Sequence, residues 1–137
     1  MPALLDTGAL ELLRRRDQRV ESLVLKHYPP VLCPHVTGEF IHCQLKVRIS
    51  PSAVLQARTY VAAFEVLTLS TRTADIYADL CHTLTVRDIT LTDSVYWIAA
   101  HALEHDLPLL TTDRSFRRVP DLVVHVLQPR FIRGPRT

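Results

Sequence analysis

The sequence predicts an α/β fold, a three-layer α/β/α sandwich around a central, mostly parallel five-stranded sheet. Two observations indicate this fold. Short apolar runs, each long enough for one buried strand, alternate along the chain with longer segments of helical periodicity. Hydrophobic residues make up 47% of the chain and glycines number only three, which favours one ordered core over a disordered chain. Continuous apolar strands are typical of a parallel sheet that helices cover on both faces.

The amino-terminal segment is expected to form a strand and two helices. The first strand is predicted at residues 2–5, an apolar run that ends at Asp6. Helices are expected over about 8–15 and 17–27, because proline at position 29 cannot continue the second one.

The middle of the chain repeats this alternation. A second strand is predicted at residues 31–34 and a helix at about 36–47, where apolar residues recur at helical spacing. Pro51 suits the first turn of a further helix, which reaches about Phe64. The run "EVLTLS" at 65–70 contains strand-forming residues and is predicted as the third strand.

The carboxyl-terminal half supplies two more helices and two more strands. One helix is expected from Thr71, and the next opens at Thr92 with apolar residues at i, i+3, i+4, i+7 and i+8. Strands are predicted at 107–110 and 122–127.

Bulk properties favour one small domain, predicted over 1–130, with a short basic tail at 131–137. The three cysteines are an odd number at wide spacings, which argues against a disulfide framework and fits a reducing cytoplasm. No apolar run approaches the ~20 residues that a membrane-crossing helix needs. We therefore expect a cytoplasmic protein without a membrane segment.

Four acids are the candidate site. Asp6 and Asp113 follow predicted strands, Asp93 opens the helix before the fourth strand, and Glu39 lies beside the buried face of its helix. In open α/β sheets, ligands bind outside the carboxyl ends of the strands, so these acids can reach one edge. Carboxylates gathered there repel one another unless a cation neutralises them, and oxygen ligands suit Mg²⁺ or Mn²⁺. Such a site predicts hydrolysis of a phosphodiester by a metal-activated water.

Each of these features also has a purely structural explanation. A single aspartate before a helix is more often an N-cap than a metal ligand, and only the joint pattern favours a metal site. The arginines at 14–19 are better explained as a solvated helix face paired with Glu11 or Glu21 than as an RNA-binding surface. For Tyr96 and Trp97, core or dimer packing is favoured over base stacking.

Four segments together resemble a PIN-domain ribonuclease, especially the VapC-type toxins of bacterial toxin–antitoxin pairs. These segments are "LLDTGALELL", "VTGEF", "DSVYWIAAHALEHDLPLLTTDRSF" and "VPDLVVHVL", in the family's order over nearly the whole chain. By this resemblance Asp6, Glu39, Asp93 and Asp113 match the family's acids. Asp6, Asp93 and Asp113 would hold Mg²⁺ or Mn²⁺, and Glu39 would complete the cluster.

The resemblance also implies a setting. The protein would be a metal-dependent endoribonuclease that leaves a 5′-phosphate and a 3′-hydroxyl on its RNA substrate. A small antitoxin, received by the amino-terminal helical region and the following helices, would silence it by inserting a basic segment into the acidic site. Homodimerisation is expected from the resemblance alone.

One departure from the family concerns the third acid. The family's spacing from "IAAHALEHDLPLLTTD" would place this acid at Val95, whereas the nearest acid is Asp93, two residues earlier. Two residues turn a helix by about 200°, so Asp93 reaches the metal only if the helix starts differently. This shift favours an alternative, a catalytically weakened PIN domain that acts as an RNA-binding or assembly module.

A third possibility is a doubly wound domain that binds Mg²⁺ for phosphotransfer, such as a phosphatase or a response-regulator receiver. The chain lacks a strand-end Asp-x-Asp motif and a clear lysine after a late strand, so this possibility ranks below the other two.

Overall fold

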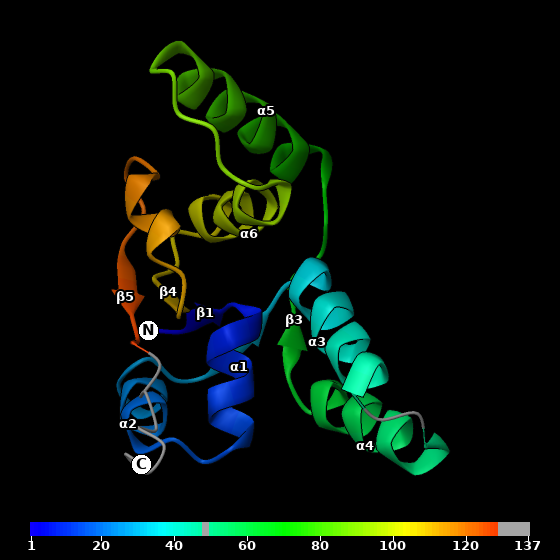
Figure 1. The fold of residues 1–137 in the computed structure, drawn as a ribbon. Helices are drawn as coiled ribbons and strands as arrows, with labels where there is room; N and C mark the ends of the chain where they lie inside the picture. The colour runs from blue at the N-terminus through cyan, green and yellow to red at the C-terminus, as the bar shows by residue number, and fades with distance from the viewer. Residues whose placement is uncertain (48–49, 129–137) are drawn as a thin grey trace, which may run out of the picture.

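A five-stranded parallel sheet forms the centre of the molecule in the computed structural model, which describes residues 1–47 and 50–128 (Figure 1). The strand order is β3-β2-β1-β4-β5, and each neighbouring pair is parallel. The strands are β1 (Ala3–Leu5), β2 (Pro30–Leu32), β3 (Glu65–Val66), β4 (Leu109–Thr111) and β5 (Val124–Val126). The predicted fold class is therefore confirmed.

Helices cover both faces of this sheet, with α1 and α2 on one side and α5 and α6 on the other (Figure 1). The helices are α1 (Thr7–Arg14), α2 (Gln18–Lys26), α3 (Pro34–Val47), α4 (Pro51–Ala62), α5 (Thr71–Val86) and α6 (Asp93–Glu104), with a 3-10 helix, η1 (Arg114–Arg118). The two central strands, β1 and β4, are buried along their whole length, whereas both residues of the edge strand β3 are exposed. None of the helices in the described part of the chain is long and apolar enough to cross a membrane.

The centre of the sheet is the pairing of β1 with β4. Leu5 lies beside Leu110, and the backbone N–H of Asp6 donates to the carbonyl of Leu110 over 3.0 Å. The chain crosses from β1 to β2 on one side and reaches β4 on the other, so the strand order reverses here. Such a switch point is where open α/β sheets bind ligands, beyond the carboxyl ends of the strands.

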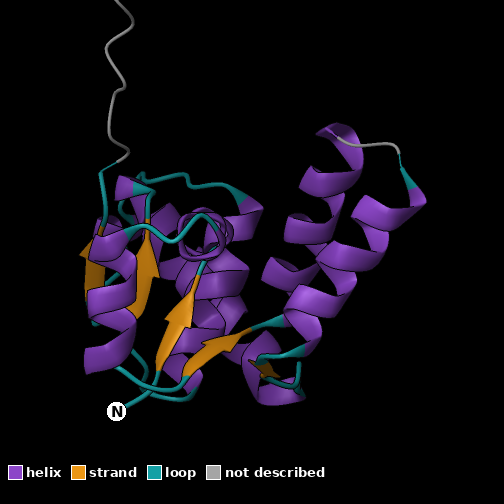
Figure 2. Ribbon diagram, turned by 90° about the horizontal axis from the view of Figure 1, so that it is seen from below, coloured by secondary structure: helices purple, strands orange, loops and turns teal. Residues whose placement is uncertain are grey.

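The helices α5 and α6 form one pair beside the sheet, and α3 and α4 form another. The start of α5 is hydrogen-bonded to the end of α6, because Glu104 accepts hydrogen bonds from the hydroxyls of Ser70 and Thr73. The α3–α4 pair projects from one side of the sheet (Figure 2). Ser50 caps α4 by accepting from the N–H of Ala53 over 3.2 Å, and Pro51 opens its first turn as predicted.

The arginines near the amino terminus form ion pairs on the helix surface, and the cysteines form no disulfide among the described residues. Arg14 and Arg15 pair with Glu11, and Arg16 pairs with Glu21, so the predicted pairing of the arginine face is confirmed. The thiols of Cys33, Cys43 and Cys81 are free. The predicted basic tail at 131–137 lies outside the described residues.

Candidate active site

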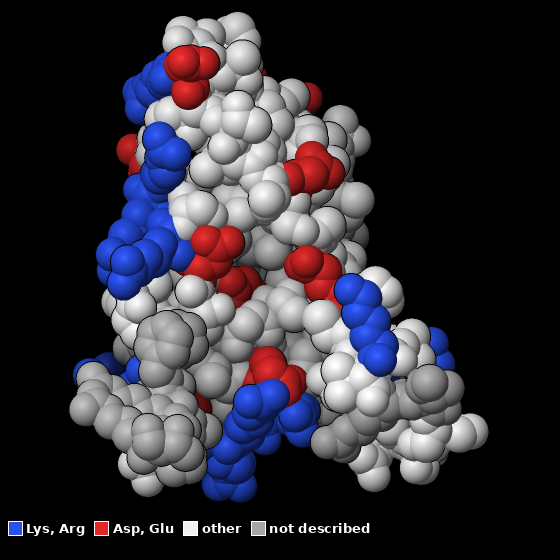
Figure 3. Space-filling view, viewed as in Figure 1, with Lys and Arg blue, Asp and Glu red and all other residues white. Residues whose placement is uncertain are grey.

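An acidic cleft lies at the carboxyl edge of the sheet, between the starts of α1 and α6, the side of α3 and the turn after β4. Its volume is about 380 Å³. Acidic side chains gather around a hollow on this face, and basic side chains lie along the neighbouring edge over η1 (Figure 3). The cleft is lined by Asp6, Thr7, Gly8, Glu39, Thr92, Ser94, Val95, Ile98, Thr112, Asp113 and Phe116.

Asp6 is the most constrained acid of the cleft. It is 5% exposed, and it caps α1 by accepting from the N–H of Ala9 over 2.9 Å. Its second carboxylate oxygen accepts a hydrogen bond from the hydroxyl of Thr111 on the neighbouring strand. Both oxygens are therefore held in place by two different parts of the chain.

The surroundings of Asp6 disfavour its charge. Burial raises the pKa of the Asp6 carboxyl to about 6, although hydrogen bonds from Thr111 and Ala9 oppose the rise. The negative charges of Asp113 and Glu39 raise this pKa further. The charges of both neighbouring acids thus act on Asp6, and a cation placed in the cleft would oppose this repulsion.

Glu39 belongs to α3 and is held across the cleft from both sides. Thr7, at the start of α1, donates its hydroxyl to Oε1 over 3.0 Å, and Ser94, at the start of α6, donates to Oε2 over 3.1 Å. The Oγ of Ser94 also lies 2.8 Å from Nε2 of His35. Glu39 therefore links α1, α3 and α6 at the site, which explains how a carboxylate on this helix is satisfied.

Asp113 lies in the turn after β4. It caps η1, because its Oδ1 accepts from the N–H of Ser115 over 2.8 Å and from the hydroxyl of the same residue over 2.7 Å. Thr111 accepts from the N–H of Asp113 over 2.9 Å, so one threonine orders both acids of the β1–β4 pair. Capping accounts for the positions of Asp6 and Asp113 and leaves both in the cleft.

Asp93 does not line the cleft, although its neighbours Thr92 and Ser94 do. Its Oδ1 accepts a hydrogen bond from the hydroxyl of Tyr77 on α5, which raises the pKa of the tyrosine. Thr92, and not Asp93, is the N-cap of α6. Val95, where the family spacing places an acid, lies in the cleft wall. The structure thus brings three of the four predicted acids together and leaves Asp93 outside.

The start of α1 lies against the turn after β4. A Cβ on Gly8 would lie 3.1 Å from the Cβ of Thr112 and closer still to its hydroxyl. Only glycine lets the start of α1 come this close to the turn without moving Thr112. Thr112 lies between Thr111 and Asp113 in the sequence. Gly8 is therefore part of what sets the width of the cleft.

The donor set of the cleft fits a hard cation. Its acids offer oxygen ligands, the type that Mg²⁺ and Mn²⁺ prefer. Among the described residues, no three His, Cys, Asp or Glu side chains lie close enough to enclose a metal ion by themselves. Water and substrate oxygens would therefore have to complete the coordination, as is usual for Mg²⁺.

Comparison with known proteins identifies the family. The family model described as "PIN domain" matches residues 3–122. This chain belongs to the PIN-domain family. A comparison with curated proteins gives no match.

Solved structures agree with the PIN fold. This PIN domain is similar to VapBC2 from Rickettsia felis bound to a DNA fragment from their promoter, with a TM-score of 0.80, 17% identity, and 93% and 100% of the two chains covered. VapBC-1 from nontypeable Haemophilus influenzae has a TM-score of 0.79, 21% identity and coverage of 92% and 98%. VapBC-5 from Mycobacterium tuberculosis, of the VapBC family of toxin–antitoxin systems, has a TM-score of 0.68, 19% identity and coverage of 93% and 98%.

The sequence did not indicate the polar residues that hold the acids of this PIN domain. Thr7 and Ser94 orient Glu39, and His35 contacts Ser94. Thr7 follows Asp6 directly and Ser94 follows Asp93, so each lies one residue from a predicted acid. This adjacency in the sequence is the only signal by which Thr7 and Ser94 could have been predicted.

Proposed function

We propose that this PIN-domain protein is a divalent-metal-dependent endoribonuclease and the toxin of a VapBC-type toxin–antitoxin pair. The observation that carries the proposal is the Asp6 carboxylate, buried at the switch point of the sheet and facing the charges of Glu39 and Asp113. A structural acid rarely keeps two further acids as neighbours, whereas a metal site requires them.

Asp6 and Asp113 are the proposed metal ligands, and Glu39 completes the cluster through water or orients the nucleophile. When bound, Mg²⁺ or Mn²⁺ would lower the pKa of a water and polarise a phosphoryl oxygen. The ligand role that the sequence predicts for Asp93 stays a prediction, because the hydrogen bond from Tyr77 would first have to break.

The protein's own groups supply orientation in this reaction. Thr111 and the Ala9 N–H fix the plane of the Asp6 carboxylate, so little reorganisation is needed when substrate arrives. Thr7 and Ser94 each donate a hydrogen bond to one oxygen of Glu39. Each oxygen keeps a further lone pair, which can accept a proton or a hydrogen bond from water. We assign contact with a substrate phosphate to Arg114, which is exposed and adjacent to Asp113 in the chain.

Cleavage of structured RNA by the purified protein tests this proposal. With ~5 mM Mg²⁺ or Mn²⁺, we expect cleavage by the wild type and a loss of about 100-fold or more in Asp6→Asn and Glu39→Gln. Asp75→Asn, an exposed acid on α5, is the matched control and should cleave like the wild type. Equal cleavage by all variants would place the activity elsewhere.

The weakened PIN domain remains the second candidate. The hydrogen bond that holds Asp93 on Tyr77 favours it, because that acid is then missing from the cleft. If the protein is a weakened PIN domain, we expect it to bind RNA in a filter-retention assay and to cleave none of the RNA classes tested with Mg²⁺ or Mn²⁺.

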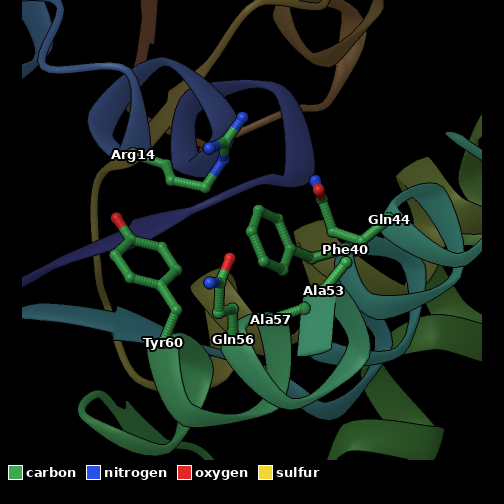
Figure 4. Close-up of a pocket in the computed structure, with 7 residues that line it drawn as sticks. All are labelled: Arg14, Phe40, Gln44, Ala53, Gln56, Ala57 and Tyr60. Carbon is green, nitrogen blue, oxygen red and sulfur yellow. The ribbon is translucent and has the colours of Figure 1, made fainter. Parts of the chain in front are cut away.

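A small antitoxin is the proposed protein partner. A groove of about 210 Å³ lies between α1, α3 and α4, where Phe40 and Tyr60 form an apolar base and Arg14 lies above it (Figure 4). Leu55 on α4 is 66% exposed beside it, which leaves apolar surface for an antitoxin helix. The other lining residues are Gln44, Ala53, Gln56 and Ala57.

Co-purification tests the partner. We expect the product of a small adjacent reading frame to co-purify with the wild type and not with Ala53→Arg, which fills the groove. Val86→Arg, at a position that is 72% exposed at the end of α5, is the control and should retain the partner. Light scattering of the free protein tests the expected homodimer.

A further inference from the structure

A second cavity adjoins the acidic cleft through His35. Its volume is about 380 Å³, and it is lined by Pro34 and His35 at the start of α3, Leu69 before α5, and Trp97 and His101 on α6. Among the described residues, no acid lines this cavity, in contrast to the cleft next to it. Its wall therefore consists of flat rings and apolar groups, which suit a neutral planar ligand better than a phosphate or a cation.

His35 joins the two sites. Its ring lines the second cavity, while its Nε2 lies 2.8 Å from the Ser94 Oγ, which lines the cleft and donates to Glu39. His35 Nε2 also lies 3.8 Å from Oε1 of Glu39, so a ligand that contacts the His35 ring adjoins the acidic cleft.

The indole of Trp97 is held rigidly. It stacks on Tyr77 with 3.9 Å between ring centroids and 13° between planes, and Asp93 accepts the hydrogen bond of the tyrosine hydroxyl. Asp93 is thus a positioning residue for this wall, acting through Tyr77. A preorganised aromatic ring favours base stacking, because no side-chain freedom is lost on binding.

His101 leaves a polar group without a protein partner. It is 2% exposed, and its Nδ1 has no hydrogen bond within the described residues. Buried polar atoms are rarely unpaired, and those that are require an explanation. The imidazole can turn about its Cβ–Cγ bond, so this nitrogen can pair with a polar edge of a ligand in the cavity.

We propose that this second cavity binds a nucleobase of the RNA substrate, next to the scissile phosphate in the acidic cleft. The base stacks against the wall formed by Trp97 and is recognised on its edge by His101 and His35. This proposal rests on the proposed function, because it takes RNA as the substrate. It assigns to α6 both a cleft residue, Ser94, and the base-binding wall.

Trp97 is the only tryptophan of the chain, so its fluorescence reports on this cavity alone. The wild type is titrated in EDTA with adenosine 5′-monophosphate, uridine 5′-monophosphate and, as the baseless control, ribose 5-phosphate. We expect saturable quenching by at least one nucleotide and none by ribose 5-phosphate. Equal effects of all three would show phosphate binding only, and no effect of any would show an empty cavity; either result overturns the proposal.

Variants locate the binding without relying on the buried histidine. Leu69→Ala, in an exposed segment, should weaken nucleotide binding several-fold, while Leu55→Ala on α4 should leave it unchanged. Trp97→Ala, followed by equilibrium dialysis, should weaken it by roughly 5- to 100-fold. Unchanged binding in Leu69→Ala and Trp97→Ala would place the nucleotide elsewhere. Nucleotide binding is measured in EDTA and therefore does not depend on the metal. If the protein binds a nucleotide but does not cleave RNA when Mg²⁺ or Mn²⁺ is present, the proposed nuclease activity is wrong and the base-binding site stands.

Discussion

The Tyr77 hydroxyl on α5 donates a hydrogen bond to Oδ1 of Asp93 at the start of α6, and Asp93 does not line the acidic cleft. The two residues lie 16 positions apart on successive helices. An acid engaged in this way supports the packing of α5 on α6, and any role for it in metal binding competes with that packing.

Asp93→Asn and Tyr77→Phe are expected to behave alike. Each removes part of the same hydrogen bond, so each should weaken nucleotide quenching of Trp97 by about 2- to 5-fold and leave Mn²⁺ affinity close to that of the wild type. Calorimetric titration with Mn²⁺ checks the second point. If Asp93→Asn alone lost Mn²⁺ binding, Asp93 would be a ligand as the sequence predicts.

Asp6→Asn is expected to stabilise the protein at neutral pH. The pKa of Asp6 is raised to about 6 in the folded state, so the unfolded chain releases this proton first as pH rises. Folded-state stability therefore falls between about pH 4 and pH 6, by up to about 3 kcal/mol, and asparagine avoids this loss. Urea unfolding in EDTA should show Asp6→Asn more stable at pH 7 and nearly equal to the wild type at pH 4. A difference that did not change with pH would refute the electrostatic explanation.

Divalent cations should stabilise the wild type through the same acids. At pH 7, ~10 mM Mg²⁺ is expected to raise the melting temperature by about 2–5 °C, because the ion binds only the folded cleft. Asp6→Asn should show little of this increase, whereas Asp75→Asn should show all of it. An equal increase in the three proteins would indicate binding outside the cleft.

Gly8→Ala and Gly38→Ala form a matched pair at helical positions. The first drives a methyl group into Thr112 and should cost about 1–3 kcal/mol of unfolding free energy and weaken Mg²⁺ binding. The second has no atom within 4 Å of the added Cβ and should stabilise α3 by about 0.5–1 kcal/mol. Chemical unfolding of both variants tests the close approach of α1 to the turn after β4.

The order of helices and strands could be predicted because local signals agree with the fold. Ser50 and Pro51 open α4 as expected, and the apolar run at 107–110 becomes a buried central strand. The bounds differ where tertiary pairing decides them: β3 was predicted over 65–70 and only Glu65–Val66 pair with β2. The 3-10 helix after Asp113 had no apolar periodicity and was not predicted.

The candidate site could be predicted only in part. Asp6 and Asp113 are given by strand ends, since parallel strands place their carboxyl ends at one edge. The side to which Asp93 points depends on where α6 begins and on a tyrosine from another helix, which spacing along the chain does not encode. The role of Trp97 likewise depends on α5 and on Leu69, and packing alone was the favoured explanation from sequence.

The hydrogen bond between Thr111 and Asp6 joins residues 105 positions apart, and this separation has a consequence for synthesis of the protein. A ribosome adds about 5–20 residues each second, so the growing chain carries Asp6 for several seconds before its partner strand exists. Until β4 emerges and pairs with β1, the carboxylates belong to separate pieces of chain. A polypeptide that ends before β4 therefore has no assembled cleft, and the cleft can form only after the ribosome has released β4.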